Sequence, residues 1–255
     1  MAKLQITVLI ENSSGCETLH CEHGLSLYLR YGEYNILLDA GQSGIFIKNA
    51  PALNCPMDTL HAAVLSHGHY DHADGFPALF ELNKTVNVYA RPAVMEPQYA
   101  EGKRYIGLCP ELAQNFAQRF DLSDEQREIL PGLWVVPDAV EHEQSLVAET
   151  KHGLVVMNSC CHAGADAIVA DLLARFPGHP VHALIGGLHL MGPGGVTTLG
   201  KQPDEIRALA LRMTQELNVA GIYTGHCTGT PAMELLKEAI PNQIHEIHTG
   251  DMLEF

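Results

Sequence analysis

The segment Ser66–Gly75 reads SHGHYDHADG and places three histidines and one aspartate within six residues. It directly follows the apolar run Ala62–Leu65, which predicts a strand, and it runs into Ala73–Leu82, which predicts a helix. Four metal-ligand side chains at one strand end need a common explanation. The segment therefore indicates both the position of a site and the alternating strand and helix architecture around it.

The spacing within this segment predicts two adjacent sets of ligands. Side chains alternate along a strand, so the strand end presents His67 and His69 on the same side. Asp71 and His72 lie in the turn that follows and point toward the same space from another angle. Imidazole and carboxylate ligands suit zinc best, with manganese or iron as alternatives, and two divalent metal ions can share one activated water. The alternative is a set of solvated loop histidines that hydrogen-bond with one another.

Four more histidines stand beside predicted strands. They are His142 before Ser145–Ala148, His162 after Leu154–Met157, His189 after Val181–Ile185 and His226 after Gly221–Tyr223. Loops at strand ends converge on one rim in layered α/β folds, so we expect these histidines near the first segment. His162 and His226 are predicted ligands, whereas His142 and His189 are either ligands or substrate contacts, or structural residues. The histidines without this setting are His20, His61, His152, His179, His182, His245 and His248.

The order of predicted elements indicates two similar halves. An antiparallel β-meander that ends at Asp39 comes first, and alternating strands and helices follow it. Strands are expected at Leu4–Ile10, Gly24–Arg30, Tyr34–Leu38, Thr85–Tyr89, Leu133–Val136 and Ile244–Ile247, helices at Pro110–Phe120, Asp166–Phe176, Ile206–Leu217 and Pro231–Ala239, and a glycine-rich loop at Gly192–Gly200. We expect one α/β domain, residues 1–255, with two sheets face to face and helices outside. Residues 92–131 are expected to form an insertion, either a lid or a plain surface connection.

Composition limits the partners and the setting of the chain. With 15 Lys and Arg against 30 Asp and Glu, the net charge is −15, which disfavours nucleic acid and anionic membrane surfaces and favours a small-molecule substrate. The seven cysteines form no CxxC pair, and the N-terminus MAKLQITVLI has no signal-peptide pattern. We therefore expect a reduced, cytoplasmic protein. No apolar run approaches the roughly 18–20 residues of a membrane-spanning helix.

These motifs resemble a known family. SHGHYDHADG resembles the signature of the metallo-β-lactamase superfamily, and LLDAG (37–41) resembles the strand and aspartate that precede it. The resemblance implies a four-layer αββα sandwich over nearly the whole chain. EHGLS (22–26), CCHAG (160–164), GGLHL (186–190) and GHCTG (225–229) further resemble a branch of dihydropteroate-synthase-like metallo-hydrolases, related to the archaeal dihydropterin ribofuranosyl-aminobenzene phosphate synthase.

The resemblance implies a role for several residues. His67 and His69 would bind one metal, Asp71 and His72 would bind the second, and His226 would be the late histidine of the second site. Asp39 would be an outer acceptor that orients a ligand, as metal-bound imidazoles generally require.

The sequence departs from the family pattern at two places. Typical hydrolases of the superfamily have a histidine before the strand at Ser145, where this chain has EHEQS (141–145), and His142 is its candidate there. They have a bridging aspartate after the strand at Leu154, where this chain has Cys160 and Cys161 and no carboxylate. Ligation by Cys160 is possible, but burial of both cysteines as small apolar residues is the favoured interpretation. Glu22 and His23 either line the substrate side or form a hydrogen-bonded turn.

Four functions are compatible with this pattern. The first is a metal-dependent hydrolase that acts on a small ester, phosphoester or lactone, with Asp71 as the catalytic residue that ligates and orients the water. The second is a transferase resembling the pterin-pathway synthase, in which Lys103 and Arg104 help to hold an anionic substrate that loses pyrophosphate. The third is an iron-bound redox protein, and the fourth is a non-catalytic metal-binding protein.

Overall fold

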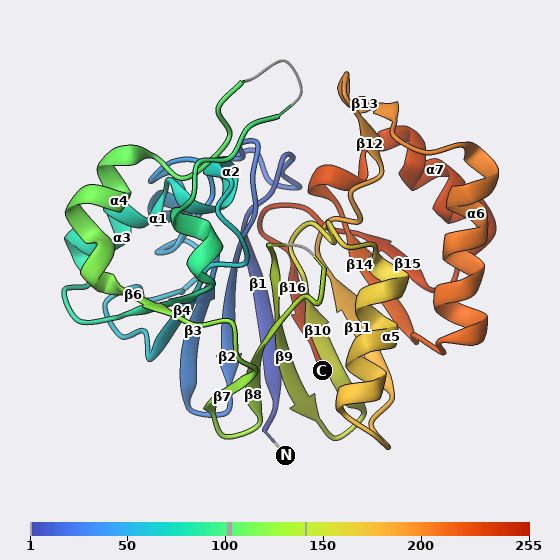
Figure 1. Cartoon of the computed structure of the whole chain (residues 1–255), viewed down its shortest axis with the longest axis horizontal. Coiled ribbons are helices and arrows are strands. Elements are labelled where there is room, and N and C mark those ends of the chain that lie inside the picture. Colours follow the sequence, from blue (N-terminus) through green and yellow to red (C-terminus); the bar gives the residue numbers. More distant parts are fainter. Residues whose placement is uncertain (1, 101–103, 141) are drawn as a thin grey trace.

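The computed structural model describes residues 2–100, 104–140 and 142–255. Two seven-stranded sheets pack face to face, and helices cover the outer face of each sheet (Figure 1). The predicted four-layer αββα sandwich is therefore confirmed. Among the described residues, no helix has the length and apolar character needed to cross a bilayer.

The first half of the chain, together with the last strand of the chain, forms one sheet and the helices outside it. Its strands, in spatial order, are β16 (Met252–Glu254), β1 (Leu4–Ile10), β2 (Ser26–Tyr31), β3 (Tyr34–Leu38), β4 (Ala62–Val64), β5 (Val88–Ala90) and β6 (Phe120–Leu122). Its helices are α1 (Phe46–Asn49), α2 (Tyr70–Ala73), α3 (Phe76–Leu82) and α4 (Pro110–Phe116). β16 to β3 are antiparallel, as the predicted meander requires, and β3 to β6 are parallel.

The second half repeats this plan. The spatial order of its strands is β15 (Ile244–Glu246), β14 (Gly221–Thr224), β11 (Val181–Ile185), β10 (Gly153–Met157), β9 (Gln144–Thr150), β8 (Leu133–Pro137) and β7 (Arg127–Leu130). Its helices are α5 (Ala165–Arg175), α6 (Pro203–Leu211) and α7 (Thr230–Ala239). β7 to β10 are antiparallel and β10 to β15 are parallel.

Three layers of apolar side chains hold the sandwich together. On β2, Leu27 and Leu29 pack between the two sheets, whereas Tyr28 packs against the helices of the first half. On β10, Val155 and Met157 face the inner layer and Val156 faces the helices of the second half. Both strands are buried on both faces, which explains why β10, GLVVM, is a continuous apolar run.

The register of the parallel strands brings their carboxyl ends to one level. Leu38 of β3 pairs with Val64 of β4, and Ile185 of β11 pairs with both Met157 of β10 and Tyr223 of β14. The loops that leave these strands therefore start side by side at one edge of the sandwich, which is where open α/β sheets usually bind ligands.

Three expected segments differ in detail. The helix expected at Ala73–Leu82 is two helices, α2 and α3, separated at Gly75, where the backbone of the 40–43 loop packs against the chain. The insertion expected at 92–131 contains β6 and β7, which extend the edges of the two sheets. The loop expected at Gly192–Gly200 is a hairpin of β12 (Met191–Gly192) and β13 (Gly195–Leu199).

Gly75→Ala is expected to destabilise the fold. A Cβ at position 75 would lie 2.0 Å from the carbonyl oxygen of Ala40 and 2.6 Å from that of Ser43, so the loop would have to move. The free energy of unfolding from denaturant titration should fall by roughly 1–3 kcal/mol or more. Gly15→Ala is the matched control, because a Cβ there meets nothing within 4 Å, and an equal effect in both variants would contradict the packing described here.

Candidate metal centre

The first group of nitrogen ligands combines the SHGH segment with the loop after β10. His67 Nε2 lies 2.9 Å from His69 Nδ1 and 3.2 Å from His162 Nε2. Two nitrogens bound to one tetrahedral zinc ion at roughly 2.0–2.1 Å would lie about 3.3 Å apart. His67 Nε2 therefore has the separation from each of the other two nitrogens that a shared metal ion requires.

The second group joins Asp71 and His72 to the loop after β14. His72 Nε2 lies 3.2 Å from His226 Nε2, and Asp71 Oδ2 lies 3.4 Å from His226 Nε2 and 3.7 Å from His72 Nε2. Cys160 Sγ is 3.3 Å from His72 Nε2. These are again the distances between ligands of one ion.

Cys160 connects the two groups. Its sulfur lies within 4.8 Å of the ligand atoms of His67 and His162 in one set, and of His72 and His226 in another. Cys161, the next residue, is also buried but packs in the core cluster beneath α5. The favoured sequence interpretation, small buried apolar residues, therefore describes the surroundings of Cys161, whereas Cys160 faces the ligands.

The outer nitrogen of each central imidazole has its own acceptor. The Ser66 hydroxyl donates to Asp39 Oδ2 at 2.7 Å, so it accepts from His67 Nδ1 at 2.9 Å. His72 Nδ1 lies 2.7 Å from the same carboxylate oxygen of Asp39. His226 Nδ1 lies 3.2 Å from the Asn12 side-chain oxygen. Each pairing places the ring proton on Nδ1 and leaves the lone pair of Nε2 directed at the centre, as metal ligation requires.

Burial and mutual proximity set the charges of these groups. Burial, followed by neighbouring histidines, lowers the pKa of His69 to about 3 and that of His162 to about 2, and it lowers the pKa of His67 and His226 as well. These four imidazoles are therefore neutral at pH 7 and able to bind a cation.

The pKa of His72 is raised and the pKa of Asp71 is lowered, because these oppositely charged groups lie close together. Burial lowers the pKa of His72, but the carboxylates of Asp71 and Asp39 outweigh it and raise that pKa to about 9. Burial raises the pKa of Asp71, but His72, His23 and His226 outweigh it and hold that pKa well below its usual range. The position between His72 and His226 thus favours positive charge, and a divalent ion bound there would replace the His72 Nε2 proton and accept the lone pairs of both rings. The donor set fits a metal centre of nitrogen, oxygen and sulfur ligands.

Two buried glutamates that no sequence motif indicated hold the ligand loops. The carboxyl oxygens of Glu143 accept the backbone N–H of Cys160 at 2.7 Å and of His162 at 2.9 Å. Glu11, at the end of β1, accepts the backbone N–H of His226 at 2.6 Å. Glu11 directly follows β1, and Glu143 directly precedes β9. An acidic residue beside a buried strand is the sequence signal that could have identified them, because a buried carboxyl group must find hydrogen-bond donors.

Of the remaining candidates, His142 forms a candidate ligand set with His69 and His162, and His23 forms one with Asp71 and His226. His23 Nε2 lies 3.3 Å from Asp71 Oδ2. The centroid of the His162 ring lies 5.1 Å from that of His142 and 4.3 Å from that of His189. Glu22 instead accepts hydrogen bonds from the backbone and hydroxyl of Ser43, which is the hydrogen-bonded turn of the sequence analysis. The histidines without a strand-end setting do not line the cavity described next.

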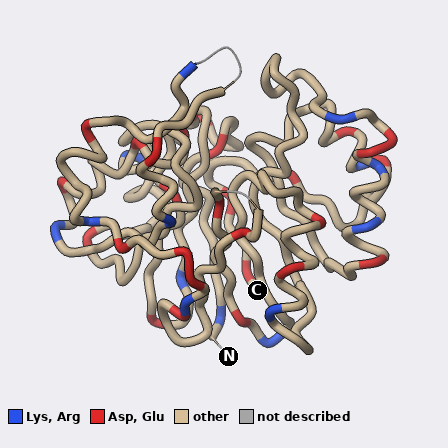
Figure 2. Tube along the Cα trace, viewed as in Figure 1, with Lys and Arg blue, Asp and Glu red and all other residues tan. Residues whose placement is uncertain are grey.

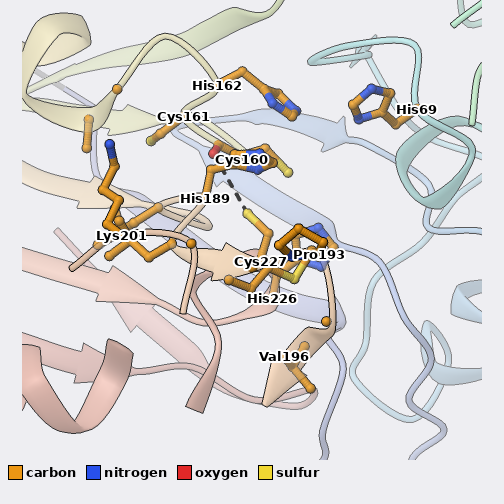
Figure 3. A pocket seen from close by; sticks show the side chains of 18 of the residues that line it. His69, Cys160, Cys161, His162, His189, Pro193, Val196, Lys201, His226 and Cys227 are labelled. Carbon is orange, nitrogen blue, oxygen red and sulfur yellow. Dashed lines mark hydrogen bonds between the residues drawn. The ribbon is translucent and has the colours of Figure 1, made fainter. Parts of the chain in front are cut away.

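Members of both ligand groups line a large open cavity of about 1620 Å³, namely His69, Asp71, Cys160, His162 and His226. One wall carries His23, Tyr70 and Arg104, and the other carries His189 and the β12–β13 hairpin. Figure 3 shows His69, His162 and His226 on different walls, with Cys160 between them and the Cys227 thiol directed at the Cys160 carbonyl. Lys103 lies outside the described residues.

Comparisons with known proteins give a family and several relatives. The profile of the metallo-beta-lactamase superfamily matches residues 21–226. A relative from Methanocaldococcus jannaschii, 7,8-dihydropterin-6-methyl-4-(beta-D-ribofuranosyl)-aminobenzene-5'-phosphate synthase, is 24% identical over an alignment that covers 99% of this chain and 97% of the relative.

Solved structures show the same fold. A metal-dependent hydrolase of the beta-lactamase superfamily is 28% identical, has a TM-score of 0.81 and matches over 99% of both chains. The Zn²⁺-bound PqqB from Methylobacterium extorquens is 17% identical, has a TM-score of 0.62 and matches over 98% of this chain and 100% of its own, so its likeness concerns the fold alone.

Cobalt substitution tests the sulfur ligand. Metal-loaded protein prepared with Co²⁺ is expected to show near-ultraviolet sulfur-to-cobalt charge transfer, because a coordinating thiol is deprotonated and donates to the metal. Cys160→Ser should abolish this absorption. Cys161→Ser, the adjacent buried cysteine, should retain it. Cobalt-loaded wild-type protein without the band, or a band unchanged by Cys160→Ser, would contradict ligation by Cys160.

Proposed function

Because the chain belongs to the metallo-β-lactamase superfamily, we propose that it is a metal-dependent hydrolase that attacks a small ester, phosphoester or lactone with an activated water. The observation that carries the proposal is the pair of ligand groups joined at Cys160, members of which line an open cavity. Ligands beside an open space are what a substrate needs in order to reach a metal ion.

The residues of the chain have distinct parts in this proposal. His67, His69 and His162 would hold one divalent ion, and Asp71, His72 and His226 would hold the other, with zinc as the favoured metal. Bound metal would act as a Lewis acid on the substrate and lower the pKa of a water toward about 7. Asp71 is ionised at neutral pH, reaches the cavity and is the candidate to orient that water.

The substrate side has few groups that could donate or accept a proton. Tyr70, His23 and His189 line the cavity near the ligands. The hydrogen bond with Cys227 raises the pKa of His189, and burial opposes it. His189 is therefore the candidate to donate a proton to a leaving group, because it lines the cavity and a raised pKa favours the protonated imidazole.

A transferase is the second candidate. It is favoured by the full-length similarity to the M. jannaschii synthase and by the missing carboxylate after β10. A cavity of about 1620 Å³ exceeds the roughly 300–1,000 Å³ of ordinary ligand pockets and leaves room for two reactants. The reaction would then release pyrophosphate instead of consuming water, with Arg104 on the cavity wall facing the anion.

A single substrate panel distinguishes these functions. Protein loaded separately with zinc, manganese or iron is assayed against phosphodiesters, esters and lactones, and against activated ribose with an aromatic amine while pyrophosphate is measured. We expect hydrolysis, and we expect His67→Ala and Asp71→Ala to lower kcat/KM by at least about a hundredfold because the metal and its water are lost.

One control variant and three outcomes test the proposed metal-dependent hydrolysis. His245→Ala should leave turnover unchanged, because His245 stacks on Tyr223 and does not line the cavity. A fully active His67→Ala, Asp71→Ala double variant would contradict metal-dependent hydrolysis. Pyrophosphate release without hydrolysis would favour the transferase, and bound metal without any turnover would favour a non-catalytic metal-binding protein.

A further inference from the structure

Arg91 joins the two halves of the sandwich beside the ligand loops. It directly follows β5 of the first sheet, and its Nη1 donates to the carbonyl oxygens of Asp138 at 3.2 Å and Glu143 at 3.1 Å. Asp138 directly follows β8 of the second sheet, and Glu143 directly precedes β9. A single guanidinium nitrogen therefore holds both ends of the connection between β8 and β9.

Further hydrogen bonds fix the second of these ends. The carbonyl oxygen of Glu143 also accepts the backbone N–H of Asp138 at 3.0 Å. The next residue, Gln144, donates its backbone N–H to the Ser66 carbonyl at 2.9 Å and its side-chain amide to the Leu65 carbonyl at 2.9 Å. The start of β9 is therefore attached to the strand end from which the SHGH segment leaves.

The carboxyl group of Glu143 connects this end to two ligands. Glu143 is fully buried, and its carboxyl oxygens accept the backbone N–H of Cys160 at 2.7 Å and of His162 at 2.9 Å. Arg91 thus fixes the main chain of the same residue whose side chain fixes the ligand loop after β10. A shift of Glu143 would therefore move His162 relative to His67.

The turn that follows Arg91 supports the first ligand group from its other side. Residues Pro92–Met95 form a short 3₁₀ helix, and the Val94 N–H donates to the Arg91 carbonyl at 3.2 Å. A Cβ on Gly68, which lies between two ligand histidines, would be 2.9 Å from Val94 Cα and 3.0 Å from the Val94 oxygen. The turn therefore packs directly against the SHGH segment.

The chemistry of the guanidinium group explains why an arginine fits this position. Acidic residues outnumber basic ones along the chain (Figure 2), yet Arg91 directs Nη1 at two backbone carbonyl oxygens. Its Nε donates to Asp124 Oδ1 at 2.7 Å, and its side chain is only 15% exposed. The planar guanidinium group makes these bonds together in fixed directions, which a lysine ammonium group on a flexible stem does not match.

We propose that Arg91 is a positioning residue for the metal ion held by His67, His69 and His162. It acts through Glu143, because it holds the main chain from which the Glu143 carboxyl group reaches the ligand loop. This inference rests on the proposed function, since it assigns a further residue to the same metal centre.

The second ligand group has different supports. Asp39 accepts from His72 Nδ1, and Glu11 accepts from the backbone N–H of His226. The loss of Arg91 should therefore affect the first metal ion more strongly than the second.

Cobalt titration of the full chain against a competing chelator tests this role. Arg91→Ala should weaken the affinity for the first ion roughly tenfold or more, with a smaller change for the second, because the loss of an outer partner of metal ligands typically lowers metal affinity by about 10–100-fold. An anomalous difference map of the variant at limiting cobalt identifies the weakened site. Arg91→Lys should recover part of the affinity, because an ammonium group still donates to a carbonyl oxygen, and it is the second variant if alanine prevents folding.

Arg119→Ala is the matched control. Arg119 also donates to two backbone carbonyl oxygens, those of Asn83 and Val86 at 3.1 Å each, but these belong to the turn between α3 and β5. Both cobalt affinities should keep their wild-type values in this variant. The free energy of unfolding of the metal-free protein is measured in every variant, so that a general loss of stability is recognised.

A double variant tests the route through Glu143. Arg91→Ala should lower the affinity for the first ion less in a Glu143→Gln background than in the wild type, because both residues hold the same loop. Equal effects in the two backgrounds would overturn this route.

The outcomes separate the positioning role from the reaction. Unchanged cobalt affinities in Arg91→Ala, an equal loss at both ions, or the same loss in Arg119→Ala would overturn the role, and hydrolysis in the substrate panel would still stand. Selective loss of the first ion in a protein that hydrolyses nothing in the panel would leave the role standing and refute the proposed hydrolysis instead.

Discussion

Buried carboxyl groups determine the geometry of the candidate metal centre. Asp39 accepts from Ser66 and His72, Glu143 accepts from the loop of Cys160 and His162, and Glu11 accepts from the backbone of His226. A buried carboxyl group without donors would cost several kcal/mol, so each of these groups selects one loop conformation. The strand register places the loops side by side, and the carboxyl groups then set the direction of each ligand.

The charge of the chain and the chemistry of the centre are connected through these groups. The chain has a net charge of −15, yet most of the ligands are imidazoles that burial keeps neutral. Neutral ligands around one ionised aspartate can hold divalent ions without filling the cavity with negative charge. Bound cations would then make an acidic protein attractive to an anionic substrate.

The sequence predicts the layers of this fold and the ligands of its most compact motif. Strand alternation and helix periodicity predict the bounds of β1 to β3, β10, α5 and α7 to within about two residues of those in the structure. The HxHxDH motif, together with one histidine from each of two later strand ends, gives six ligand candidates. Glu11 and Glu143 escape prediction because their partners are backbone N–H groups that only the folded chain brings near. β6 and β7 escape because an edge strand of three or four residues has too little period to detect. The direction of Cys160 depends on the turn at Cys161, with φ of 49°, which no local pattern encodes.

An element-specific anomalous difference map of metal-loaded crystals tests the central claim most directly. Two peaks are expected at the carboxyl ends of the parallel strands. One should lie within bonding distance of His67 Nε2, His69 Nδ1 and His162 Nε2, and the other within bonding distance of Asp71, His72 and His226. A single peak, or peaks bound by residues other than these six and Cys160, would contradict the assignment of the metal centre.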